Sequence, residues 1–277
     1  CGVLSFMPDS LGKLIKMNKV PVVAVVHHGN HLHSPFWNFR KKRKVPMHTT
    51  MTQILTTEQI KAMSVDEINQ AVKEGLYYDD YKYAYENGIK ITEDYRAEGL
   101  HKVLYQCPNC KTEHKMDSKG TEIFCTECGK RWKLHETGYL EGNDGVTEFD
   151  HIPDWYKWER ECVRKELEEG TYLLDTDVDI SIQVNLDGVC DIGSGHLRHD
   201  LNGFHLVSAD GKLDYKQGPS YSHTLYSDYY WYEIGDVIGI GNNEYSYFCF
   251  PKGNESVSKA RLATEELYKM TKKRKND

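Results

Sequence analysis

Four cysteines in two closely spaced pairs carry the clearest chemical signal in the sequence. Cys107 and Cys110 form one Cys-x2-Cys pair, and Cys125 and Cys128 form a second pair further along the chain. A two-residue gap lets one tight turn direct two sulfurs at the same ion, and two such pairs complete the tetrahedron of thiolates that Zn²⁺ prefers. The spacing therefore predicts a zinc ion held by all four cysteines. Two disulfides are a weaker interpretation, because the other cysteines are scattered and nothing marks the chain as secreted.

A closed site of four thiolates leaves no position for water or substrate, so we expect the metal to stabilise a small zinc ribbon. Residues 115–120 read as its hairpin turn and 122–124 as the returning strand. Nucleic-acid binding is the main alternative role for such a ribbon. No arginine-rich or aromatic face accompanies the cysteines, and the net charge of the chain is −7, so no nucleic-acid partner is expected.

The bulk composition is that of a soluble globular protein. The chain has 277 residues, 39% hydrophobic and 28% charged, which leaves room for about two domains. No run of 18 apolar residues occurs, so no membrane-spanning helix is predicted. Eight cysteines, half of them metal ligands, suit a reducing cytosol. Because the chain begins at Cys1 rather than at a methionine, we expect it to be the later part of a longer protein.

The elements before the ribbon suggest a layered α/β region. A short helix is expected over 8–18, followed by a continuous apolar run at 20–26. A run without alternation is typical of a strand covered on both faces, as in an α/β sheet. A further strand over 47–55 and a helix beginning at the capping box of Ser64 and Glu67 are also expected. Residues 77–100 read as a long helix end and a connector.

Two polar stretches in this region could have functional roles. Four histidines between 27 and 33 could bind a metal, but a polar loop is favoured because no carboxylate or cysteine lies nearby in sequence. The basic run at 40–44 reads as a solvated loop, with attraction to an anionic membrane surface as the alternative.

The C-terminal half changes from helix to short strands. Asp154 is a candidate N-cap and Gly170 a candidate stop for one amphipathic helix. Period-two alternation and the turn signals Asn202-Gly203 and Asp210-Gly211 then predict an antiparallel meander. The expected strands cover 178–184, 195–200, 203–207, 212–215, 229–234, 236–241 and 245–250, and a helix over 258–270 closes the chain. This arrangement resembles an antiparallel β-barrel of the pleckstrin-homology or GRAM type.

Several sequence blocks together resemble one enzyme family. They are P-D-S-L-G-K-L-I-K at 8–16, K-V-P-V-V-A-V-V at 19–26, H-G-N-H-L-H-S-P-F-W-N at 28–38, G-L-H-K-V-L-Y-Q-C-P-N-C at 99–110 and F-D-H-I-P-D-W-Y-K-W-E-R at 149–160. Their order is similar to the later half of bacterial 1-acyl-glycerol-3-phosphate (lysophosphatidate) acyltransferases, in a Firmicute-type branch with a C-terminal zinc ribbon. The resemblance implies a partial acyltransferase sheet and places Pro21 near the acyl-substrate pocket.

The same resemblance implies a role in phospholipid biosynthesis. The parent protein would move a fatty acyl group from acyl-CoA or acyl-carrier protein to the free hydroxyl of lysophosphatidate. It would act in the cytoplasm, peripheral to the inner face of the membrane, where an anionic surface could be a partner. The alternative is a non-enzymatic module of ribbon and barrel that binds a protein or a lipid headgroup.

The family's catalytic motif is not expected within this chain. Its His-x4-Asp motif, in which aspartate orients histidine as general base, precedes the helix at 8–18 in the family. The spacings His205 to Asp210 and His223 to Asp228 lie after the ribbon and read as coincidence. We therefore expect no catalytic residue here and an inactive fragment. The expected organisation is an acyltransferase part at 1–100, a zinc ribbon at 101–138, a linker and helix at 139–170, and the barrel-like domain at 171–277.

Overall fold

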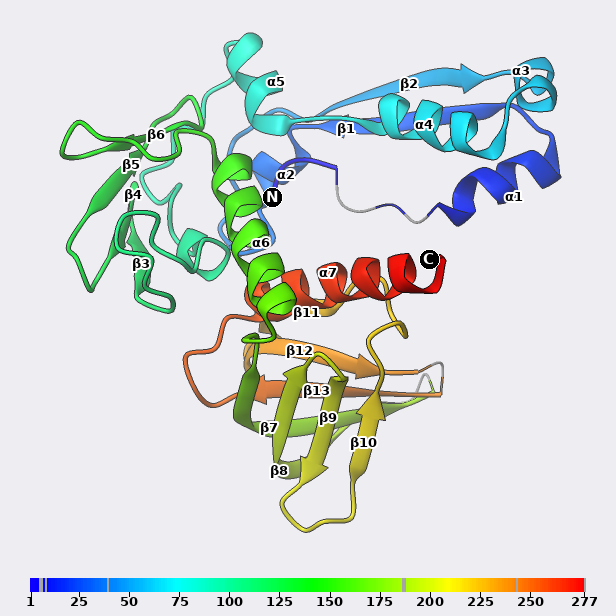
Figure 1. Cartoon of the computed structure of the whole chain (residues 1–277). Coiled ribbons are helices and arrows are strands. Elements are labelled where there is room, and N and C mark those ends of the chain that lie inside the picture. Colours follow the sequence, from blue (N-terminus) through cyan, green and yellow to red (C-terminus); the bar gives the residue numbers. More distant parts are fainter. Residues whose placement is uncertain (5–6, 8, 39, 186–187, 243, 277) are drawn as a thin grey trace.

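The computed structural model describes residues 1–277 except 5–6, 8, 39, 186–187, 243 and 277. Within that part of the chain the fold is mixed α+β, built around three antiparallel sheets of two, four and seven strands. Figure 1 shows the two-stranded sheet at the top, the four-stranded sheet at the left and the seven-stranded sheet below, with two long helices between them. No helix in the described part is both long and apolar enough to cross a membrane.

The N-terminal region is a two-stranded antiparallel sheet, called the β1–β2 ribbon below, with helices on one side. Its elements are α1 (Ser10–Asn18), β1 (Val22–His28), α2 (Asn30–His33), β2 (His48–Leu55), α3 (Thr57–Ala62) and α4 (Val65–Leu76). A small core centred on Leu55, Ile60, Ile68 and Val72 joins β2 to α3 and α4. The predicted capping box is confirmed: the Glu67 N–H donates to Ser64 Oγ at 3.2 Å, and the Ser64 N–H donates to the Glu67 carboxylate at 2.7 Å.

The apolar run at 20–26 forms a strand, but not one covered on both faces. Ala24 is 4% exposed, whereas Val23 and Val25 on the opposite face are 48% and 42% exposed. Helix α4 contacts one face of the ribbon. Among the described strands, β1 pairs only with β2, and it does so antiparallel. The expectation of a doubly covered strand is therefore wrong, because no element within the described residues covers its outer face.

Residues 77–100 contain less helix than expected. After α5 (Asp80–Glu86) the chain runs irregularly to the short helix η1 (Leu100–Lys102). The N-cap Asp79 accepts a hydrogen bond from the Lys82 N–H. Tyr81 is fully buried, whereas Tyr77 and Tyr85 remain exposed, so this aromatic-rich stretch is only partly core.

The region predicted to be a zinc ribbon forms the four-stranded sheet, in the order β3-β4-β5-β6. Its strands are β3 (Met116–Lys119), β4 (Glu122–Cys125), β5 (Arg131–Leu134) and β6 (Leu140–Gly142). The predicted hairpin is present, although most of the expected turn at 115–120 is itself strand β3. Helix α6 (Ile152–Glu169) follows and ends at Gly170, as predicted, with φ +72°. Its N-cap is His151, not Asp154, because Pro153 already fits the first helical turn.

The C-terminal region is one seven-stranded sheet in the order β10-β9-β8-β7-β13-β12-β11. The strands are β7 (Leu174–Val184), β8 (Val189–Asp200), β9 (Gly203–Ser208), β10 (Asp214–Gln217), β11 (Tyr226–Trp231), β12 (Gly235–Gly241) and β13 (Tyr245–Pro251). All seven predicted strands have a counterpart, although β11 lies three residues before the expected 229–234, and helix α7 (Val257–Asn276) closes the chain as expected. The expected barrel is not closed, because β10 and β11 remain the two edges of the sheet.

A single large core links these regions. It extends from Leu32 in α2, through Trp132 in the ribbon and Trp155 in α6, to Leu267 in α7. Helices α6 and α7 pack against each other, and α7 also contacts β11 and β12 (Figure 1). The four-cysteine region is therefore built into the main core of the molecule.

Candidate metal centre

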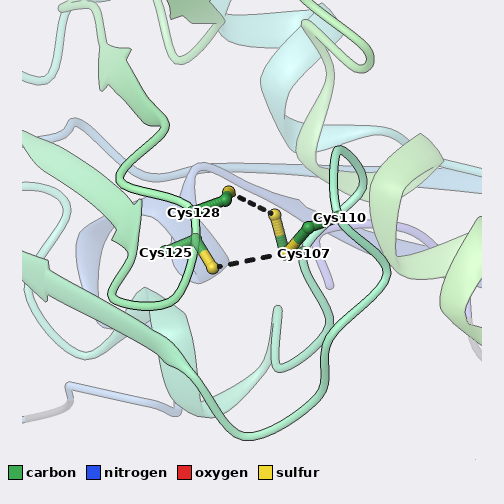
Figure 2. A group of neighbouring side chains, drawn as sticks. All are labelled: Cys107, Cys110, Cys125 and Cys128. Atoms are coloured by element: carbon green, nitrogen blue, oxygen red, sulfur yellow. Dashed lines mark hydrogen bonds between the residues drawn. The ribbon is translucent and has the colours of Figure 1, made fainter.

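The four predicted cysteines converge on one point. Figure 2 shows Cys107 and Cys110 on one loop facing Cys125 and Cys128 on another. The Sγ atoms of Cys107 and Cys128 lie 3.7 Å apart, as do those of Cys110 and Cys125. All four sulfurs lie within 4.8 Å of one another. A tetrahedron with Zn–S bonds of about 2.3 Å has edges of about 3.8 Å. The cluster could therefore hold a metal ion and is compatible with zinc.

The same distances argue against disulfides. A disulfide joins its sulfurs at about 2.05 Å, and all four cysteines are free. Among the described residues, this is the group of histidine, cysteine and acidic side chains with metal-binding geometry. With four thiolates the coordination shell would be complete, so a bound ion would stabilise the fold without an open position for substrate.

Backbone hydrogen bonds build the two cysteine turns in the same way. In the first turn the Cys107 N–H donates to the Thr112 carbonyl at 3.0 Å, and the Lys111 N–H donates to the Cys107 carbonyl at 2.9 Å. In the second turn the Cys125 N–H donates to the Lys130 carbonyl at 2.9 Å, and the Gly129 N–H donates to the Cys125 carbonyl at 3.0 Å. The equivalence of these bonds fixes the two sulfur pairs in matching orientations.

The residue after each second cysteine has a left-handed backbone. Gly129 has φ +75° and Lys111 has φ +65°. Glycine adopts this conformation freely, whereas a residue with a Cβ atom is strained there by roughly 1 kcal/mol. Lys111 compensates with its side chain, which donates to the Pro108 carbonyl at 2.5 Å and lies 4.7 Å from the Trp158 ring. This role of Lys111 was not predicted from the sequence, although Lys111 and Gly129 occupy the same place in the two turns.

Helix α6 supports the cysteine turns from behind. The Trp155 and Trp132 rings lie 5.0 Å apart in an edge-to-face contact, and Trp155 Nε1 donates to the Gln106 carbonyl at 3.1 Å. The fully buried Glu159 accepts the Gln106 N–H at 2.9 Å. Two consecutive turns of α6 thus hold the residue immediately before Cys107. Glu159 was not singled out from the sequence, because an isolated glutamate on a helix gives no signal of its burial.

The environments of the thiols differ. Burial raises the pKa of Cys107 and of Cys125. Burial also opposes ionisation of Cys110, but hydrogen bonds to Thr112 and to neighbouring thiols outweigh it and lower the pKa of Cys110 to about 6. Because a metal binds the thiolate forms, it would displace the remaining thiol protons on binding.

The four histidines at 27–33 do not form a metal-binding group among the described residues. His31 is enclosed by Phe36, Trp37 and Tyr81, with the Trp37 ring 5.1 Å away. Burial lowers the pKa of His31 well below its usual value. The His28 ring stacks on the Tyr83 ring, with the two ring centres 4.1 Å apart. These histidines therefore contact aromatic rings, hydroxyls and backbone. The expected polar loop is wrong, because His27 and His28 end strand β1 and His31 and His33 belong to helix α2.

The basic run is less solvated than expected. Arg43 is 3% exposed and donates to the carbonyls of Leu32 and Arg96. Lys41 donates to Glu98 at 2.6 Å, and Arg40 lies 3.0 Å from Glu233. Lys42 and Lys44 are exposed, so only part of the run is available to an external anion.

Pro21 and the histidine–aspartate spacings also have clear positions. Pro21 is exposed immediately before β1, away from the cysteine cluster. His205 Nε2 lies 2.8 Å from Asp214. Asp210 instead accepts from Ser208 Oγ at 2.7 Å, and the Asp228 carboxylate accepts from the Tyr229 N–H. The spacing of His205 and Asp210 therefore does not correspond to a hydrogen-bonded dyad.

Comparison with known proteins assigns no family. No protein-family model, curated protein or solved structure matches the chain significantly.

Proposed function

We propose that the four cysteines hold a structural zinc ion. The 3.7 Å sulfur separations support zinc, since they are close to the edge of a Zn–S4 tetrahedron. Burial of Cys107 and Cys125 in the main core supports a role in folding. The protein's activity would then lie outside the metal centre.

We further propose that the chain is part of a phospholipid-biosynthesis acyltransferase that acylates lysophosphatidate. The observation that carries this proposal is the ordered set of sequence blocks, two of which coincide with α1 and β1. Among the described strands β1 pairs on one side only, which is also consistent with the proposal, because an acyltransferase sheet needs further strands beside it. The family's His-x4-Asp motif would have to come from residues outside these 277.

The C-terminal sheet and helix would be accessory in this proposal. Seven antiparallel strands followed by α7 support a fold of the pleckstrin-homology or GRAM type, open at β10 and β11. Such a fold hosts many functions, so it supports a binding or bracing role without specifying a ligand.

An assay of acyl transfer from acyl-CoA to lysophosphatidate tests the proposal. We expect no turnover above the blank from the 277-residue chain, and turnover from a longer protein that includes the family's catalytic motif. In the longer protein Pro21→Ala should raise KM for the acyl donor severalfold, because the resemblance places Pro21 near that pocket. Pro46→Ala is the matched control, since Pro46 is also exposed and precedes strand β2. Turnover by the 277-residue chain alone, or none by the longer protein, would contradict the proposal.

A non-enzymatic binding module is the second candidate. A cavity of about 780 Å³ lies between the four-stranded sheet that carries the cysteines and the seven-stranded sheet. The cysteine-containing region contributes His114 and Lys115 to its lining. The seven-stranded sheet and the loop after it contribute Asp179, Asp236 and Lys252. A polar cavity of this size could receive a peptide or headgroup. An inactive longer protein would favour this candidate.

A further inference from the structure

A pocket of about 570 Å³ lies at one end of the seven-stranded sheet. It is formed by the segment 218–225, which links β10 to β11, together with the ends of strands β11, β12 and β13. Gln217 of the edge strand β10 and Tyr226 of the edge strand β11 both line it. The pocket is therefore built where the two edges of the open sheet approach each other, and its volume is in the range of small-molecule sites.

The lining of this pocket carries no charge. Charged residues make up 28% of the chain, yet none of the sixteen described lining residues is a lysine, arginine, histidine, aspartate or glutamate. A ligand with a phosphate, carboxylate or ammonium group would lose its hydration here without gaining a counter-charge. The pocket therefore favours a neutral ligand.

Uncharged amide and hydroxyl groups line the same pocket, among them those of Asn242 and Ser246. Gln217 is 5% exposed, and its Oε1 accepts hydrogen bonds from the Gly241 N–H and the Tyr215 hydroxyl, both at 3.1 Å. Among the described residues no acceptor contacts the NH2 group of this amide, so that group can donate to a ligand. A purely apolar ligand would cover these groups without pairing them, which is unfavourable.

Aromatic rings complete the lining. Three of its tyrosines remain exposed, Tyr221 at 57%, Tyr226 at 50% and Tyr232 at 78%. The Trp231 ring stacks on the Phe248 ring with centres 4.5 Å apart, and the Tyr232 ring meets Trp231 edge to face. The electron-rich faces of such rings attract C–H groups. The pocket therefore combines flat aromatic surfaces with neutral hydrogen-bonding groups.

The backbone is shaped to hold these rings. Tyr226 and Gly239 are cross-strand partners, and a Cβ atom at Gly239 would lie 2.6 Å from Cδ1 of the Tyr226 ring. Glycine at this position therefore lets the ring lie against β12. Tyr230 and Tyr232 have φ +57° and +42°, a left-handed conformation that bulky residues rarely adopt. Backbone strain of this kind is concentrated at functional sites.

We propose that this pocket binds a neutral oligosaccharide. A sugar ring has an apolar C–H face and a rim of uncharged hydroxyls, so it matches both parts of the lining. The exposed tyrosine rings stack on the sugar faces, while Gln217, Asn242 and Ser246 hydrogen-bond to the hydroxyls. The site is independent of the acyltransferase proposal and of the metal centre, since it shares no residue with either.

A proline-rich peptide is the main competing ligand, because it also docks on aromatic side chains. A run of prolines has no N–H group, however. It would therefore leave the amide and hydroxyl oxygens of the lining without donors, whereas sugar hydroxyls both donate and accept. The observations favour the saccharide.

Isothermal titration calorimetry of the 277-residue chain with three neutral trisaccharides tests the proposal. The probes are maltotriose, cellotriose and triacetylchitotriose, and we expect at least one to bind with a Kd of about 1 mM or tighter. A charged counterpart of that sugar, with a carboxylate or an ammonium group in place of a neutral substituent, should bind at least about tenfold more weakly.

Two pairs of variants locate the binding. Gly239→Ala should weaken it about tenfold, because the added methyl displaces the Tyr226 ring. Gly235→Ala in the same strand is the matched control, since a Cβ atom there would lie 3.9 Å from the Phe250 ring, an ordinary contact. Tyr232→Ala should weaken binding about fivefold. Tyr77→Ala removes another exposed tyrosine, far along the chain, and should leave the affinity unchanged.

Three outcomes would overturn the proposal. One is the absence of binding to all three trisaccharides. Another is wild-type affinity in Gly239→Ala and Tyr232→Ala when circular dichroism shows them to be folded; if Gly239→Ala does not fold, Tyr232→Ala decides alone. The third is binding of a decaproline peptide in place of the sugars, since the pocket would then be a peptide groove.

Discussion

His199 shows how one buried residue can control the response of the fold to pH. It lies in β8, 1% exposed, with its ring stacked 3.7 Å from Phe204 and its Nδ1 3.0 Å from the Tyr172 hydroxyl. Burial lowers the pKa of His199 from 6.5 to about 3, against a small opposing effect of Asp200. In the unfolded chain this histidine takes up a proton near pH 6.5, whereas the folded chain keeps it neutral until about pH 3. Its contribution to stability is thus present above pH 6.5 and is lost as the pH falls toward 3.

We predict that His199→Gln makes the loss of stability in acid less steep. A single group of this kind changes the free energy of unfolding by about 1.4 kcal/mol per pH unit, or about 2 kcal/mol between pH 6.5 and 5. Urea unfolding at several pH values measures the slope, which is independent of the stacking energy lost in the variant. His205→Gln on neighbouring β9, where the ring is half-exposed beside Asp214, serves as the control. Identical slopes for wild type and His199→Gln would show that His199 is not kept neutral in the fold.

The four-cysteine cluster also shows which residues a sequence can reveal. The spacing of the four cysteines predicted their convergence, because two short turns must each present two sulfurs to one point. The supporting residues could not be predicted in the same way. Lys111 adopts a backbone conformation usually given to glycine, and Glu159 is buried by contacts more than 50 residues away in sequence. Such roles depend on tertiary packing, which leaves no local pattern.

At the scale of elements, local sequence signals predicted a strand or a helix end correctly where one buried face or one capping residue is enough to specify it. Alternation and turn residues predicted the seven strands, and Gly170 predicted the end of α6. The run at 20–26 was misleading about burial, since a continuous apolar strand is typical of a doubly covered sheet. Whether its outer face is covered depends on what packs there, and composition does not encode that.

Buried carboxylates of α7 link it to α6: Glu265 pairs with Arg160 at 2.7 Å, and Glu266 pairs with more cations. Glu266 is fully buried and accepts hydrogen bonds from Arg160, Arg164 and Lys269 at 3.0, 2.8 and 2.6 Å. Burial opposes its ionisation, but the hydrogen bonds outweigh this effect and lower the pKa of Glu266. A buried anion with three cationic partners should be costly to neutralise, because its partners would lose their counter-charge.

We predict that Glu266→Gln lowers the free energy of unfolding by about 2–3 kcal/mol. This is less than the usual cost of breaking a fully buried pair, because Arg164 is about half exposed. Glu168→Gln, at an exposed position of α6, should change stability by less than about 0.5 kcal/mol. Urea unfolding followed by tryptophan fluorescence compares the two variants. Equal stabilities would mean that the ion pairs of Glu266 add no net stability to the contact between the helices.

At the scale of the whole molecule, the four-cysteine region shares one core with helices α6 and α7. The N-terminal sheet of β1 and β2 packs with α3 and α4 around a second core. The Trp132–Trp155 contact carries the main core from β5 into α6. The smaller core of Leu55, Ile60, Ile68 and Val72 belongs to β2, α3 and α4. Loss of the metal should therefore affect these two parts of the chain differently.

We predict that removing the metal loosens the cysteine region and α6 together but leaves α3 and α4 protected. Elemental analysis should give about one zinc per chain, and Cys110→Ser should lower it strongly, because three thiolates cannot close the coordination shell. Amide hydrogen exchange in this variant should rise over 104–134 and 152–169 and stay unchanged over 57–76. Cys190→Ser, at an exposed cysteine outside the cluster, is the matched control. Exchange that rises equally in all three segments would mean that the two cores unfold as one unit. Zinc content that is unaffected by Cys110→Ser would rule out the four-cysteine site itself.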